Sequence, residues 1–163
     1  MKIIRKLNKY MHMQENKTNF FSKLSLISIA LTVILTSITH AYELGSRALI
    51  AGGILIIIMG VLNIFYQCNT NKMLFVLYAL LNAWVIVGFG VINGFWNHVF
   101  KIFLTYLHNG HLPPLLAGLF SDSKIGSIFF ESVGILTFVA SMFAAYYIFQ
   151  MVPKKQNDNT EII

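Results

Sequence analysis

Four long apolar runs constrain the fold of this chain more than any other feature. They cover residues 24–42, 48–66, 73–95 and 126–152, and Glu131 is the only charged side chain within them. A helix needs about 20 apolar residues to cross the hydrocarbon core, where its backbone polar groups must be paired internally. The runs predict an all-α integral membrane protein with four transmembrane helices, and the short connections between the first three predict an antiparallel bundle.

The charged residues support this class. They make up 11% of the chain, against about a quarter in soluble proteins. The formal net charge of +6 comes from basic residues that flank the apolar runs, which favours contact with a lipid surface and not with nucleic acid. The single cysteine, Cys68, excludes an intramolecular disulfide and any multi-cysteine zinc or iron–sulfur site.

Residues 1–23 form a tail with six basic side chains. It suits either a short amphipathic helix on anionic lipid or a disordered positive segment. The run at 24–42 also has the features of a signal peptide, because Thr39-His40-Ala41 resembles a cleavage site. The long basic segment and the long apolar run favour a retained first span.

The distribution of lysine and arginine predicts the orientation. Six basic residues in the tail at 1–23, with Lys72, Lys154 and Lys155, fall on one side of the membrane, and Arg47, Lys101 and Lys124 on the other. Positive residues concentrate on the cytoplasmic side. We therefore expect a multi-pass protein of the plasma (inner) membrane, with both termini cytoplasmic, a membrane domain at 24–152 and a C-terminal tail at 153–163.

The connection at 96–125 is the only long one, and it should form an ordered outer cap. His98, Lys101, Thr105 and His108 recur at helical spacing among apolar residues. This pattern predicts an amphipathic helix at the membrane interface, with its polar stripe toward water. Asn109-Gly110 should end that helix, and Pro113-Pro114 should prevent its immediate restart.

Several potential ligands gather at the outer side of this topology. Histidine and carboxylate side chains bind transition metals, and two histidines can hold a haem. The candidate metal ligands are His40, Glu43, His98, His108 and His111. No recognised ligand spacing is present, and the competing interpretation is that these histidines are interfacial polar groups.

Glu131 is the second candidate site. Carboxylates within a membrane usually face the protein interior and often carry function. Its face of the fourth span bears small residues, so we expect it to point into the bundle. It should pair with His40, His98 or Lys124, or else stay protonated as a buried polar or proton-carrying group. Asn63 and Asn82 also need partners inside the bundle, and Gly90 and Gly94 have a spacing typical of close helix contacts.

No phosphate-binding loop, nucleophile elbow or paired-cysteine motif occurs, which disfavours a soluble-type enzyme. The leading hypothesis is a non-catalytic membrane protein, acting as a subunit or accessory of a larger assembly or as a homo-oligomer. The alternatives are a metal- or haem-binding redox protein and a proton or small-solute transporter that uses Glu131.

Overall fold

The computed structural model describes residues 2–69, 71–112, 114–120 and 128–152, with the side chains of residues 2–15 and 43 excepted. This part of the chain is helical except for short turns, and it contains no strand. The elements in order are α1 (Lys2–Leu44), α2 (Ser46–Asn69), α3 (Lys72–Val85), η1 (Ile86–Phe100), α4 (Lys101–Leu107), α5 (Pro114–Ala117) and α6 (Ile128–Met151).

Four of the described helical stretches are long and apolar enough to cross a membrane. They are Asn16–Tyr42, Ser46–Asn69, Lys72–Leu107 and Ile128–Met151. Each overlaps one of the apolar runs of the sequence. For the described residues, the prediction of an all-helical fold with four helices able to cross a membrane by length and composition is therefore confirmed.

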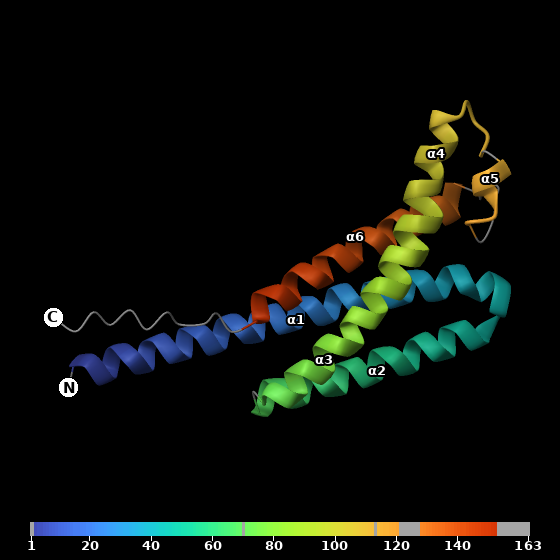
Figure 1. Cartoon of the computed structure of the whole chain (residues 1–163). Helices are drawn as coiled ribbons and strands as arrows, with labels where there is room; N and C mark the ends of the chain where they lie inside the picture. The colour runs from blue at the N-terminus through green and yellow to red at the C-terminus, as the bar shows by residue number, and fades with distance from the viewer. Residues whose placement is uncertain (1, 70, 113, 121–127, 153–163) are drawn as a thin grey trace.

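The helices pack around α1. Figure 1 shows α6 lying along α1 and α2 returning beside α1. The stretch from α3 to α4 rises across α1 and α6. The chain reverses between α1 and α2 at Gly45, whose φ of +67° suits glycine because it has no side chain. The centre is apolar and is formed by the buried side chains of Ile29, Val33, Met59, Val85, Ile86 and Ala144.

The third long helix continues well past the end of the apolar run at Phe95. The chain passes from α3 through η1 into α4 with helical dihedral angles at both junctions. Residues 86–100 form a π-helix, which is wider than an α-helix and usually occurs as single turns near functional sites. No proline interrupts this stretch, so nothing in the local sequence ends the helix before His108.

The end of this helix follows the prediction. Asn109 and Gly110 have φ values of 56° and 90°, and the Gly110 amide donates to the Thr105 carbonyl at 2.9 Å. Helix α5 then begins at Pro114, sooner than expected, because proline is well tolerated in the first helical turn. The Trp96 indole donates to the Leu119 carbonyl at 3.0 Å, which ties this loop to η1.

Candidate functional site

Three ionisable side chains meet where α6 begins. The Glu131 carboxylate places Oε2 2.8 Å from Nδ1 of His98 and Oε1 3.0 Å from Nζ of Lys101. The exposed fractions of the three side chains are 8% for Glu131, 14% for His98 and 5% for Lys101. We call these residues the outer charged cluster, after the outer side on which the predicted topology places them.

Helix geometry explains why the groups meet. His98 and Lys101 are three residues apart, so they lie on the same face although one belongs to η1 and the other to α4. Glu131 lies in the first turn of α6, where the unpaired amides of a helix N-terminus favour a negative charge. His98 and Lys101 therefore both face a carboxylate that the helix end already stabilises.

Glycines allow η1 and α6 to approach closely enough for this contact. A β-carbon added to Gly134 would lie 2.1 Å from Cγ of His98, so the imidazole ring occupies the space above this glycine. One added to Gly94 would lie 2.8 Å from the Phe138 amide nitrogen. Gly90 lies in the same way against the Ser141 side chain. The predicted Gly90–Gly94 pair thus lies at a helix contact.

The charges in the cluster favour contact between α6 and the helical stretch that carries His98 and Lys101. The negative carboxylate and the positive lysine neutralise each other, which offsets part of the cost of burying two charges. Because Nδ1 of His98 faces a carboxylate, we assign a hydrogen to Nδ1, which donates to Glu131. Glu131 therefore accepts from two different helical segments and joins both of them to α6.

Part of this cluster was expected. Glu131 is buried, as its predicted inward orientation requires, and it pairs with His98, one of the partners predicted together with His40 and Lys124. Lys101 is the partner that sequence reasoning missed, because its spacing with His98 and Thr105 suggested a stripe facing water. The structure buries Lys101 and Thr105 to 4% exposure instead. The sequence signal was the helical spacing of these residues, which puts them on one face of a helix. Only the packing against α6 shows that this face points into the protein and not toward water.

The other candidate ligands are dispersed. His108 and His111 are exposed, and Nδ1 of His108 lies 2.9 Å from the carbonyl of Leu104 in its own helix. His40 is half-buried on α1, and the side chain of Glu43 lies outside the described residues. Among the side chains that the structure describes, no three from histidine, cysteine, aspartate and glutamate are grouped to hold a metal ion. The predicted metal or haem site stays a prediction.

A second group of buried polar side chains lies between α1, α2 and α3. The Asn63 amide nitrogen donates to the Ser22 carbonyl at 3.0 Å and to the Ser22 hydroxyl at 2.8 Å. The hydroxyls of Ser25 and Tyr78 are 2.6 Å apart, and the Asn82 amide donates to the Tyr78 carbonyl. We call these five residues the inner polar cluster, after the inner side of the predicted topology, and they are at most 1% exposed.

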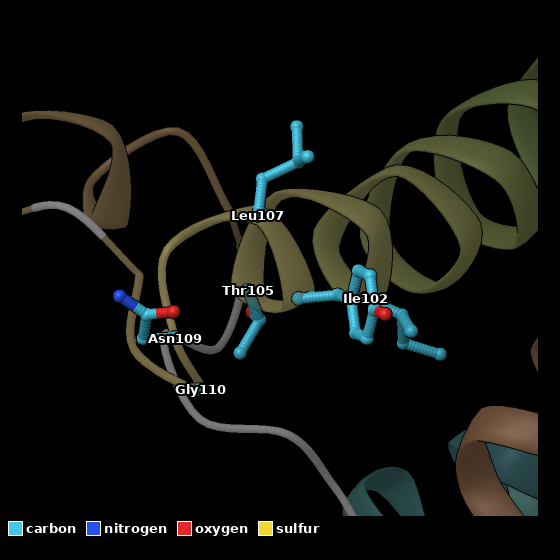
Figure 2. A pocket seen from close by; sticks show the side chains of 6 residues that line it. Ile102, Thr105, Leu107, Asn109 and Gly110 are labelled. Carbon is cyan, nitrogen blue, oxygen red and sulfur yellow. The ribbon is translucent and has the colours of Figure 1, made fainter.

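A hollow of about 690 Å³ opens at the end of α4. It is lined by Ile102, Thr105, Tyr106, Leu107, Asn109 and Gly110. Figure 2 shows these side chains around the turn that ends the helix. None of the six is ionisable near neutral pH, so the hollow itself offers no charged group for catalysis or metal binding.

The chain matches no protein-family model, no curated protein and no solved structure. Its class therefore rests on its own features. Four long apolar helices and buried polar contacts between them are consistent with a multi-pass membrane protein.

Proposed function

We propose that the protein is a non-catalytic subunit or accessory of a membrane assembly. In this proposal it lies in the plasma membrane as an antiparallel four-helix bundle with both termini cytoplasmic. The end of the third long helix and the loop after it form the cap at the outer interface, and the basic N-terminal tail faces anionic lipid.

The observation that carries this proposal is the unequal burial of the four spans. In the most apolar stretch of α1, 44% of residues are buried within the chain, against 17% for α2 and 22% for the third span. Large side chains such as Ile50, Ile57 and Trp84 are mostly exposed on these two helices. Two helices that are so little covered have the surface for neighbouring membrane helices as well as for lipid.

The polar groups support a structural role. His98 and Tyr78 lie on one continuous helix, at most about 30 Å apart by the α-helical rise because part of it is π-helical, and this is close to the thickness of the hydrocarbon core. The outer charged cluster and the inner polar cluster would thus join the helices near the two membrane surfaces. Between them, buried hydroxyls such as those of Thr32 and Thr137 donate to carbonyls of their own helices.

Photocrosslinking in native membranes tests the proposal. A photoreactive amino acid at Ile57 lies on the exposed face of α2, and one at Phe143 on α6 is a matched control of similar exposure. If α2 contacts a partner, Ile57 should give a discrete protein adduct while Phe143 labels mainly lipid. A second probe at Trp84 tests the exposed face of α3. If the probes at Ile57 and Trp84 both label lipid and no protein, no partner contacts this surface.

A proton or small-solute transporter that uses Glu131 is the second candidate. The buried carboxylate favours it, because an ionisable side chain inside a membrane helix often marks a proton or solute pathway. Proteoliposomes with an internal pH dye would detect proton entry after an external acid pulse. If the protein transports protons, protons should enter the proteoliposomes, and Glu131→Gln should abolish this entry in a protein that still folds. Equal rates of proton entry into liposomes with and without the protein would exclude proton transport by the protein alone.

The metal or haem alternative has a direct test. Visible absorbance and metal analysis of the purified chain would detect a stoichiometric cofactor. If one is present, loss of His40 together with His98, His108 and His111 should remove it. A cofactor that survives this combined replacement would exclude these histidines as its ligands.

A further inference from the structure

The conformation of η1 is unusual for its length. Its 15 residues, Ile86–Phe100, form a π-helix, whereas π-helices are rare and mostly limited to single turns. The stretch contains no proline, so its sequence permits an ordinary α-helix, although Gly88, Gly90 and Gly94 weaken that form. A disfavoured backbone conformation persists only where its surroundings stabilise it. The contacts around η1 should therefore explain why it is π-helical.

The packing of η1 against the rest of the bundle provides that explanation. The positions of η1 that are buried or face α6 recur at every fourth residue, at Ile86, Gly90, Gly94 and His98. An α-helix has 3.6 residues per turn, so three steps of four residues would carry this row about 120° around its surface. A π-helix has more than four residues per turn, which keeps the row close to a straight line. The π form thus keeps these positions together on one side of the helix.

This row is held in place by two kinds of contact. Ile86 lies in the apolar centre of the bundle, and side chains in place of Gly90 and Gly94 would overlap atoms of α6. The outer charged cluster follows at the outer end of the row, where Glu131 joins both of its partners to α6. Close packing therefore holds the inner part of η1, and charge holds its outer end.

Opening of the outer charged cluster would release that end. Nζ of Lys101 lies 3.0 Å from the Glu131 carboxylate, in a buried position. Loss of the carboxylate charge removes the negative group that this ammonium faces, which favours its movement toward water. In an α form of η1, the residues after Phe100 are turned around the helix axis, away from α6. The α form thus moves Lys101 toward water and relieves the backbone at the same time.

We propose that η1 is a two-state segment. In the closed state, the outer charged cluster holds it as a π-helix against α6. In the open state it is an α-helix, which is longer because each turn holds fewer residues. The contact of Tyr78 with Ser25 fixes α3 to α1, so the change displaces the opposite end, which carries α4 and the hollow beside it.

Such a segment couples the state of Glu131 to the position of the outer cap. A contact or a proton that alters the Glu131 carboxylate would move α4, and displacement of α4 would open the outer charged cluster. The proposal does not depend on the function proposed above, because this coupling suits an assembly subunit and a transporter equally.

Double electron–electron resonance on the full chain in nanodiscs tests the proposal. Spin labels on cysteines at the exposed positions Phe65 on α2 and Phe103 on α4 report the length of the third long helix, after Cys68→Ser removes the native thiol. Labels at Phe65 and Leu136 on α6 form a reference pair that does not include η1. Without further changes, the first pair should give one distance. Glu131→Gln should add a second distance, longer by several ångströms, while the reference distance stays the same.

Two further variants make the result specific. Ser132→Ala, at the exposed position beside Glu131, is the matched control and should keep the single distance. Glu131→Asp keeps the charge but shortens the side chain, so it is the milder variant and should show the second distance in a smaller fraction of molecules. Unchanged distances in both Glu131 variants overturn the proposal. A changed reference distance in both also overturns it, because the whole bundle has then opened and not η1 alone.

Discussion

Gly134 of α6 lies directly against the imidazole ring of His98, with no space for a side chain between the two helices. A β-carbon there would lie 2.1 Å from Cγ and 2.2 Å from Cδ2 of the ring. The outer charged cluster therefore depends on a glycine as much as on its three ionisable residues. Any side chain at this position must displace His98 and, with it, the contact to Glu131.

The first prediction concerns this close approach. Gly134→Ala should destabilise the protein by about 1–3 kcal/mol, the usual cost of overpacking a buried contact. The midpoint of thermal unfolding in mild detergent would measure it. Gly53→Ala is the control, because a β-carbon at Gly53 has no neighbour within 4 Å. Equal unfolding midpoints for the two variants would contradict the prediction, because η1 and α6 could then move apart at Gly134 without loss of stability.

The second prediction concerns the ion pair. Glu131→Leu leaves the buried ammonium of Lys101 without its carboxylate, which should cost about 3–5 kcal/mol. Adding Lys101→Met should restore part of this loss, because the buried ammonium that faced Glu131 is then removed as well. Denaturation of the single and double variants measures the coupling. If the double variant is as unstable as the sum of the two single variants, the pair contributes no mutual stabilisation.

The third prediction concerns the Asn63 contacts. Asn63→Leu should lower stability by about 0.6 kcal/mol and by no more than about 1.7 kcal/mol, the average and the maximum for side-chain hydrogen bonds between membrane helices. The variant loses the two bonds that Asn63 donates to Ser22. Leu62→Ile, at the neighbouring half-buried position, is the control and should change the unfolding midpoint less. A higher midpoint for Asn63→Leu would contradict the prediction.

The fourth prediction tests the proposed orientation. A cysteine replacing the exposed Leu115 on α5 should react with a membrane-impermeant maleimide added to intact cells. The native Cys68 is also exposed but should react only after the cells are opened, because it lies on the predicted cytoplasmic side. The reverse labelling pattern would invert the topology.

The sequence was most informative where local chemistry decides the structure. Long uncharged runs predict helices because lipid leaves the backbone no other partner. Asn109-Gly110 predicts a helix end because both residues adopt positive φ at low cost. These features depend on neighbouring residues in the chain, and the structure agrees with them.

Features that depend on distant segments were harder to predict. The sequence placed Lys101 on the water-facing stripe of a separate helix, because a lysine among apolar residues usually reaches water. Its burial follows from Glu131, which lies thirty residues later and faces it across the helix contact. The π-helical stretch at 86–100 also had no sequence signal, since its glycines predicted only close packing.

The stretch Lys72–Leu107 has a further physical consequence if it crosses the bilayer. Its 36 residues correspond to roughly 50 Å of helix, against a hydrocarbon thickness of about 30 Å. A free helix relieves such mismatch by tilting. Here Gly90, Gly94 and His98 fix the helix against α6, so it cannot tilt alone. The residues after His98 would then lie outside the hydrocarbon core, as the proposed outer cap requires, and a tilt of this helix alone cannot draw them into the bilayer.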